Sequence, residues 1–315
     1  MAADRPYRVH KFGGSSVADA ACFERVAAIV RDVSSGTPTA VVVSAMRGMT
    51  DTLLSLADSA ELGDTDFAAA MAGLGERYET AACRLLDPDS RGRVIDGFHA
   101  DLGSLTDVLK AVALVRSAPE RSRDMIAGFG ELWSSRLLAA LLEQTLPGVA
   151  VRWLDAREAL TIRKTKLGPA VLWERSAERL GEALGDYRDG VVVITGFIAA
   201  DEQGLQANLG RNGSDFSASI FAALLKAKDL TIWTDVDGVL SADPRRVPEA
   251  RVIGSVSYNE AMELAYFGAK VIHPQTMGPA VDHDIPILIR NTFRPDAPGT
   301  QVIPVSGRDE LIKGI

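Results

Sequence analysis

Cysteine, basic charge and long apolar runs are all scarce in this sequence of 315 residues. The two cysteines, Cys22 and Cys83, cannot build a disulfide framework, and no Cys/His spacing typical of zinc sites occurs. Acidic side chains outnumber basic ones by 42 to 34, and the net charge of −8 disfavours nonspecific binding to nucleic acid or anionic membranes. The N-terminus lacks an apolar signal-peptide core, and no apolar run reaches membrane-spanning length. We therefore expect a cytoplasmic protein without nucleic-acid or membrane partners.

Sequence motifs of several enzyme classes are missing as well. There is no Gly-x-x-x-x-Gly-Lys-Ser/Thr loop, no Gly-x-Gly-x-x-Gly after a strand, no protein-kinase His-Arg-Asp and no Gly-x-Ser-x-Gly elbow. The four histidines are scattered without partner spacing. Any nucleophile is therefore expected to come from the substrate.

Short β-branched runs alternate with longer helical stretches along the chain. Apolar runs predict strands, and 3.6-residue periodicity predicts helices. The expected strands are 8–12, 39–45, 149–155, 190–200, one beginning near 229, and 285–293; the expected helices are 18–35, most of 52–146, and 216–227. Residues 87–92 are expected to form a loop between helices. This alternation predicts an α/β fold with a mostly parallel sheet.

The stretch "KFGGSS" follows the first predicted strand. Gly13 and Gly14 would let backbone N–H groups approach phosphate oxygens, Lys11 would supply a positive charge, and Ser15 adds a donor near the start of a helix. The alternative is a plain tight turn. Taken alone, the stretch does not decide between a phosphate site and a turn.

Two later loops also follow apolar runs. In "LGRNGSD", Arg211 offers a bidentate fork and Ser214 a hydroxyl for a carboxylate, whereas the simpler interpretation makes Asp215 the N-cap of the next helix. In "WTDVDGVLSADPR", Thr234 and Asp235 could face a nucleotide and Arg245 a phosphate; the alternative is a surface hairpin.

Six stretches together resemble the aspartate kinases, within the amino-acid-kinase superfamily. They are "KFGGSSVAD", "VVVSAMRGMTD", "GFGELWSSRLLAALL", "LGRNGSD", "IWTDVDGVLSADPR" and "ELAYFGAKVIHPQTMGPA", in the family's order, over about residues 7–303. The sequence of these stretches is most similar to the kinase portions of bifunctional aspartate kinases fused to homoserine dehydrogenase or diaminopimelate decarboxylase. The resemblance implies a three-layer sandwich with helices on both faces of the sheet.

The resemblance also implies the reaction. In such kinases the β-carboxylate of L-aspartate attacks the γ-phosphate of ATP, giving 4-phospho-L-aspartate and ADP, the first step toward lysine, threonine and methionine. Lys11 matches the lysine that stabilises the transferring phosphoryl group, Gly13, Gly14 and Ser15 line the phosphates, and Asp215 organises the lysine and the metal–phosphate group. Mg²⁺ is implied by ATP chemistry, because no direct metal-ligand motif is present.

Further residues match the substrate and nucleotide positions of the family. On the substrate side, Arg211 and Ser214 would hold a carboxylate and Glu131 would recognise the ammonium group; Ser44 and Thr50 would lie beside them. On the ATP side, the matched positions are Thr234, Asp235, Leu240, Arg245, Lys270 and Val271. Leu240 stands where many members have an aromatic residue, and Asn208 replaces a hydroxyl residue.

The resemblance divides the chain as well. It implies a catalytic domain over 1–303, with an amino-acid-binding lobe over about 1–200 that contains the helical insertion 52–146, and a nucleotide-binding lobe over about 201–303. Residues 304–315 are expected to be a tail or linker, with no ACT regulatory domain and no strong inhibition by lysine or threonine. The implied partners are a second copy in a homodimer and a fused or downstream pathway enzyme.

Two other functions remain open at this point. One keeps the fold and changes the acceptor to glutamate, an acylated glutamate, a carbamate or a nucleotide monophosphate. Glu131 favours a free amino acid over an acylated one, because an acylated amine would leave this carboxylate without a charge partner. The other is a catalytically weak ligand-binding domain, which Leu240 and Asn208 would favour.

Overall fold

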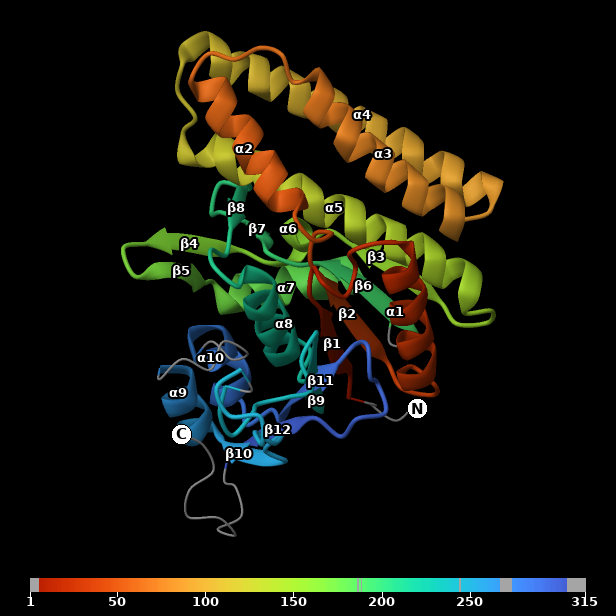
Figure 1. The fold of residues 1–315 in the computed structure, drawn as a ribbon, viewed down its shortest axis with the longest axis vertical. Coiled ribbons are helices and arrows are strands. Elements are labelled where there is room, and N and C mark those ends of the chain that lie inside the picture. The colour runs from red at the N-terminus through yellow and green to blue at the C-terminus, as the bar shows by residue number, and fades with distance from the viewer. Residues whose placement is uncertain (1–5, 186, 188, 244, 267–273, 305–315) are drawn as a thin grey trace.

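A mostly parallel sheet forms the centre of the molecule (Figure 1). The computed structural model describes residues 6–304 except 186, 188, 244 and 267–273. In spatial order the eight described strands of this sheet are β10 (Ser255–Ser257), β12 (Thr300–Ile303), β11 (Ile287–Asn291), β9 (Asp229–Thr234), β1 (Arg8–Phe12), β2 (Thr39–Val43), β6 (Val191–Thr195) and β3 (Val151–Leu154).

Each neighbouring pair of these strands is parallel except β11 with β12. The central strands β2 and β6 are buried along their whole length, as expected for apolar runs covered on both faces. β1 lies between β2 and β9, with Lys11 opposite Val42 on one side and Ile232 on the other.

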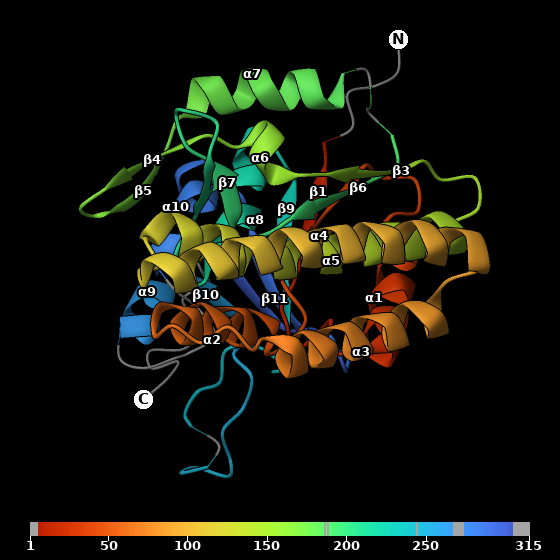
Figure 2. The same ribbon diagram turned by 90° about the horizontal axis from the view of Figure 1, so that it is seen from above.

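Helices cover both faces of the sheet, so the fold has three layers (Figures 1 and 2). One face packs against α5 (Glu120–Thr145), with α1 (Ala20–Val33) beside it. The opposite face packs against α8 (Gly213–Leu224), which is backed by α7 (Trp173–Leu184) and α10 (Pro274–Asp282). The short helices are α6 (Ala156–Ala159), against α7, and α9 (Tyr258–Tyr266), near β10. The predicted α/β fold class is confirmed.

Three further helices pack outside α5: α2 (Met49–Glu61), α3 (Ala68–Leu85) and α4 (Pro88–Val115), as Figure 1 shows. They fall in the stretch predicted to be helical. Buried rings join them to α5, with Phe98 4.4 Å from Tyr78 and 4.6 Å from Trp133 between ring centroids. The loop predicted at 87–92 is wrong, because Asp87 accepts hydrogen bonds from the N–H groups of Asp89 and Ser90 and so caps α4.

Two small hairpins were not predicted from the sequence. β4 (Ile162–Thr165) pairs with β5 (Gly168–Val171), and β7 (Ile198–Ala200) pairs with β8 (Gln206–Asn208). The single strand predicted over 190–200 is divided into β6 and β7 by Gly196 and Phe197, and Phe197 has a left-handed φ of 65°. This break turns the chain toward the end of the sheet.

The helix α5 is the core helix of the molecule. Among the described residues it alone is long and apolar enough to cross a membrane by length and composition, but 89% of its most apolar window is buried inside the protein. It packs between the sheet and the outer helices, which accounts for its apolar character.

Candidate active site

The loops after β1, β2 and β6 meet at the carboxyl edge of the sheet and form a cleft of about 510 Å³. The amino end of α8 and the middle of α5 complete its walls. Ligands of open α/β sheets bind at this edge, because the carboxyl ends of parallel strands lie together there. Predicted residues that line this one cleft are Lys11, Gly14, Ser44, Thr50, Glu131, Arg211, Ser214 and Asp215.

The two residues predicted to be catalytic form an ion pair across the cleft. Lys11 extends from β1, and its Nζ lies 2.6 Å from Oδ1 of Asp215 on α8. The two side chains are only 11% and 24% exposed, so solvent screens their charges weakly. Lys11 is thereby held beside a glycine loop and a helix amino end, both of which favour an anion.

The glycine loop after β1 is bonded to both neighbouring strand ends. The N–H of Gly13 donates to the carbonyl of Trp233 at 3.4 Å, and the N–H of Arg47 donates to the carbonyl of Gly14 at 3.1 Å. A side chain at Gly14 would place its Cβ 3.0 Å from the carbonyl oxygen of Ala45. Glycine therefore permits the close backbone approach on which the cleft depends.

Glu131 is buried in the wall that α5 contributes. It is 4% exposed, and its Oε2 has no hydrogen-bond partner among the described residues. Burial raises the pKa of this carboxyl to about 8, although a backbone N–H bond from Ala45 opposes the rise. A buried carboxyl without a cation of its own is suited to bind an ammonium group.

Arg211 and Ser214 lie where the chain passes from β8 into α8. Asn212 has a left-handed φ of 55° and precedes the first helical residue, Gly213. The Arg211 side chain is exposed and forms no ion pair with another described residue, so its guanidinium is free to bind a carboxylate. The alternative interpretation of Asp215 as an N-cap is wrong: α8 begins two residues earlier, and Asp215 lies in its first turn.

Gly196 supports this corner of the cleft. A Cβ added to Gly196 would lie 2.8 Å from the carbonyl oxygen of Val43 and 2.9 Å from Cβ of Ser214. Both neighbours belong to elements that form the cleft. Only a residue without a side chain leaves Ser214 in its present position.

Gly196→Ala is therefore expected to destabilise the protein by about 1–3 kcal/mol through overpacking and to raise the KM of the carboxylate substrate, since Ser214 must move. Thermal unfolding and steady-state kinetics test this. Gly181→Ala is the control: it lies inside α7 with open space around it and should be neutral or stabilising. An unchanged KM in Gly196→Ala would contradict the expectation.

Of the residues predicted to contact the nucleotide, the described ones after β9 do not line this cleft. Thr234 ends β9 and its hydroxyl contacts Asp235 at 3.3 Å, while Leu240 forms an isolated bridge with Val252. Arg245 is 80% exposed, and its guanidinium pairs with Asp243 at 3.0 Å. Lys270 and Val271 lie outside the described residues. The nucleotide assignments therefore remain predictions.

Gly210, Asn212 and Gly213, which belong to the predicted carboxylate-binding loop "LGRNGSD", also line the cleft. The cleft residues that were not selected from the sequence are Ala45, Met46, Arg47, Gly48, Asp51 and Phe197. Arg47 lies inside the stretch "VVVSAMRGMTD" and is exposed. Its position between two glycine-containing loops is the sequence feature that would have identified it as a cleft residue. Phe197 carried no signal, because its positive φ and its place beside the cleft depend on the packing of β6 and β7.

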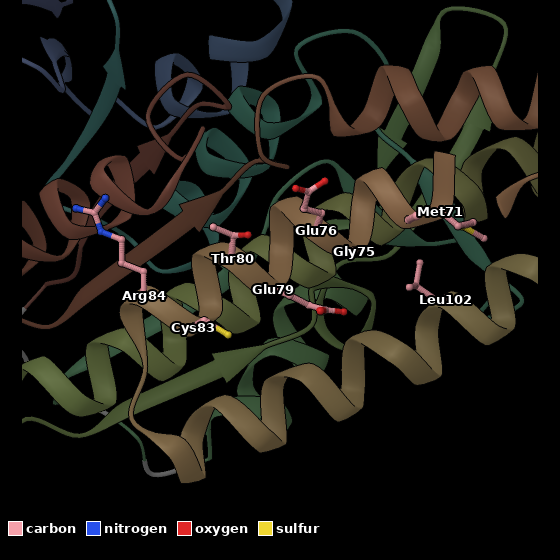
Figure 3. Close-up of a pocket in the computed structure, with 9 residues that line it drawn as sticks. Met71, Gly75, Glu76, Glu79, Thr80, Cys83, Arg84 and Leu102 are labelled. Carbon is pink, nitrogen blue, oxygen red and sulfur yellow. The ribbon is translucent and has the colours of Figure 1, made fainter. Parts of the chain in front are cut away.

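A larger, open cleft of about 950 Å³ lies between α3 and α4 (Figure 3). Glu76 and Glu79 are the acidic side chains on it, and Arg84, at one end, is paired with Glu24. The described residues that line it include neither a glycine loop nor a cation without an acidic partner that could bind a phosphate. The smaller cleft at the sheet edge is therefore the candidate active site.

The described residues contain no group of three or more His, Cys, Asp or Glu side chains that could hold a metal ion by itself. Asp215 is a single carboxylate at the site of the predicted phosphates. One carboxylate fits Mg²⁺, which is commonly held by one or two carboxylates together with substrate phosphates and water.

The family model "Amino acid kinase family" matches residues 6–291. The chain belongs to the amino acid kinase family. It is 40% identical over 299 residues to bifunctional aspartokinase/homoserine dehydrogenase 1 of Arabidopsis thaliana, covering 94% of this chain and 32% of that protein. It is 37% identical to the bifunctional aspartokinase/homoserine dehydrogenase of Haemophilus influenzae, covering 98% and 38%. The chain thus spans about a third of the length of these curated relatives.

Among solved structures, the family member is similar to Escherichia coli aspartokinase III in complex with aspartate and ADP. The TM-score is 0.84 at 31% identity, and the match covers 98% of this chain and 67% of the other. The resemblance to aspartate kinases found from the six sequence stretches is confirmed, and so is its emphasis on bifunctional relatives.

Proposed function

We propose that this family member is an aspartate kinase domain, which transfers the γ-phosphate of ATP to the β-carboxylate of L-aspartate. The observation that carries the proposal is the charge arrangement of one cleft. Lys11 is held by Asp215 beside the glycine loop, while the same cleft contains the buried Glu131 and Arg211, which forms no ion pair with a described residue. These groups are complementary to a phosphoryl group, an ammonium group and a carboxylate.

The amino acid would be fixed by its two charged α-substituents. Glu131 accepts the ammonium group, and Arg211 with Ser214 binds the α-carboxylate. The β-carboxylate then extends toward Lys11. Because this carboxylate is already ionised at pH 7, no general base is required and catalysis depends on positioning and charge stabilisation.

The phosphoryl group would be stabilised from the β1 side of the cleft. Lys11 neutralises charge on the transferring oxygens, and the backbone of Gly13 and Gly14 with the amino end of α8 favours the same anion. Asp215 keeps the lysine ammonium in place. Mg²⁺ bound with ATP would neutralise phosphate charge, and Asp215 is the residue suited to contact it.

The remaining assignments complete the proposal. The segment after β9, with Thr234 and Asp235, would contact the nucleotide, and residues of the first half of the chain would contact the amino acid. The relatives named above are bifunctional aspartokinase/homoserine dehydrogenases, so a homoserine dehydrogenase is a candidate fused partner. The product would enter lysine and threonine biosynthesis in the cytoplasm.

The test is ADP release from Mg-ATP with L-aspartate, L-glutamate or N-acetyl-L-glutamate as acceptor, with hydroxylamine present to trap an acyl phosphate. We expect hydroxamate with L-aspartate and none with N-acetyl-L-glutamate, because Glu131 offers a partner for a free ammonium group and not for an acylated one; L-glutamate tests whether the distance from the ammonium group to Lys11 selects the shorter side chain. Equal signals with N-acetyl-L-glutamate would exclude the proposed substrate. Protein that binds ADP but phosphorylates none of the three would be a ligand-binding domain instead.

A further inference from the structure

The turn that follows β11, residues 290–294, lies at the same sheet edge as the cleft. β11 is parallel to β9, and β9 is parallel to β1, so all three strands end at this edge. The N–H of Thr292 donates to the carbonyl of Thr234 at 2.8 Å, which extends the pairing beyond the last strand residue. This segment, named here the β11 turn, therefore reaches the chain on which the nucleotide assignments fall.

The β11 turn is bonded to the glycine loop through two hydroxyls. The Oγ atoms of Ser16 and Thr292 lie 2.7 Å apart, and both residues are fully buried. Ser16 also closes the loop itself, since its N–H donates to the carbonyl of Gly13 at 2.9 Å. Loss of the Ser16 hydroxyl would leave that of Thr292 without this buried partner, and loss of the Thr292 hydroxyl would leave Ser16 with only a long contact of 3.5 Å to the carbonyl of Trp233; either loss is unfavourable.

The same turn is bonded to the segment after β9. The side-chain amide of Asn291 donates to Oδ1 of Asp237 at 2.8 Å, and Arg294 pairs with Oδ2 of Asp237 at 2.5 Å. The Oδ1 of Asn291 accepts from the N–H of Phe293, which fixes the orientation of the amide. Asp237 follows the predicted nucleotide residue Asp235 by two positions, so its restraint fixes that segment too.

The contacts of the β11 turn with Ser16 and with Asp237 join segments that are far apart in the sequence. The relative position of these segments matters for the proposed reaction. Phosphoryl transfer depends on the alignment of attacking, transferring and leaving oxygens, and small displacements lower the rate strongly. A turn that holds both the glycine loop and the segment after β9 sets their separation.

We propose that the β11 turn is a clamp for the nucleotide, in which Asn291, Thr292 and Arg294 are positioning residues that act through Ser16 and Asp237. The inference rests on the proposed function, since it takes the nucleotide to lie between the two clamped segments. It assigns to the end of β11 a role in ATP binding rather than in amino-acid binding.

The test measures Mg-ADP binding by calorimetry, which needs no acceptor, together with steady-state kinetics. Thr292→Val keeps the shape and removes the hydroxyl, and it is expected to weaken Mg-ADP binding by about tenfold while the KM of aspartate stays unchanged. Thr292→Ser restores the hydroxyl and should restore binding. In a double-mutant cycle, Ser16→Ala should add little to Thr292→Val, because both remove the same bond.

Ser176→Ala is the matched control. Ser176 lies in α7 and does not line the cleft; its hydroxyl is also fully buried and accepts a hydrogen bond from the N–H of Thr161. It should lower thermal stability without changing Mg-ADP binding.

Three outcomes would overturn the clamp: a Thr292→Val variant that loses stability with unchanged Mg-ADP binding, a Thr292→Ser variant that binds no better than Thr292→Val, or equal increases in the KM values of aspartate and ATP. If Thr292→Val does not fold, Ser16→Ala, which only deletes one oxygen, carries the same test. Wild-type protein that binds Mg-ADP but phosphorylates no acceptor would refute the proposed function and leave the clamp measurable.

Discussion

Lys11→Met is expected to lower kcat by about 10³-fold or more, in the range found when a cation that stabilises a transferring phosphoryl group is removed. This expectation follows from the positive charge that Lys11 places in the cleft. Lys11 is the only lysine that lines the cleft in the described part of the chain, and methionine matches its length while removing its charge. The measurement is aspartate-dependent ADP release at saturating substrates, together with Mg-ADP affinity by calorimetry.

The Lys11–Asp215 ion pair makes a second variant informative. In Lys11→Met the Asp215 carboxylate loses its partner at 2.6 Å and would repel the nucleotide phosphates, so Mg-ADP binding should weaken as well. Adding Asp215→Asn removes this repulsion and should recover part of the binding of ADP measured without Mg²⁺, where the proposed metal contact of Asp215 plays no part, without recovering kcat. Recovery of both would mean that Lys11 serves only to neutralise Asp215.

Lys164→Met is the control for Lys11→Met. Lys164 is also a lysine held by acidic partners, Glu120 and Asp124, but it lies on β4 away from the cleft. Its replacement should leave kcat within about twofold, because neither Lys164 nor its two partners line the cleft. A comparable loss of activity in both variants would show that ion-pair loss, and not the position of Lys11, lowers the rate.

The elements predictable from the sequence are those with strong local patterns. The all-apolar run of β2 and the "KFGGSS" loop after β1 are such cases. Burial on both faces requires consecutive apolar residues, and close backbone approach requires consecutive glycines. Asp87 is the opposite case. Asp, Pro and Ser are as typical of a loop as of the start of a helix. Only the hydrogen bonds that Asp87 accepts from backbone N–H groups show that a helix begins here.

The candidate site required more than local pattern. Glu131 lies in the middle of the buried helix α5, where periodicity alone suggests an ordinary helix carboxylate; it is buried because α5 packs against the loop after β2. The family resemblance supplied that assignment. Ser16 and Thr292 are separated by 276 positions, so no sequence window contains both, and their contact depends on the parallel order of β1, β9 and β11.

Glu131→Gln is expected to raise the KM of aspartate by about 10²-fold, with a small effect on kcat and on Mg-ADP binding, because a charge-assisted hydrogen bond to the substrate ammonium is lost. Glu79→Gln is the control, since Glu79 is an exposed carboxylate on α3 that contacts His99. A Glu131→Gln enzyme with an unchanged KM would mean that the acceptor carries no ammonium group at this position.

The raised pKa of Glu131 gives this prediction a pH dependence of definite sign. Burial holds the pKa near 8 in the free protein, so at pH 6–7 most molecules carry a protonated Glu131. An ammonium ion binds the ionised form, so binding releases a proton. The KM of aspartate should therefore fall as pH rises from 6 to 8, by at most about tenfold per pH unit, and should level off above pH 8.

Calorimetry in buffers of different ionisation enthalpy measures the released proton directly. We expect release of up to one proton on aspartate binding to wild-type protein at pH 7, and none to Glu131→Gln. The same variant should lose the fall in KM between pH 6 and 8. A fall in KM that persists in Glu131→Gln would assign the titration to another group.

Stability supplies an independent check of the same pKa without any substrate. The unfolded chain releases the Glu131 proton near 4.5, whereas the folded protein keeps it to about 8. Between these values the folded state binds more protons, so the contribution of Glu131 to the free energy of unfolding falls as pH rises. Glu131→Gln removes this contribution, and its Tm relative to wild type should therefore rise from pH 4.5 to pH 8. A constant difference would mean that Glu131 is ionised in the free protein, and the ammonium group would then bind to a carboxylate that is already charged.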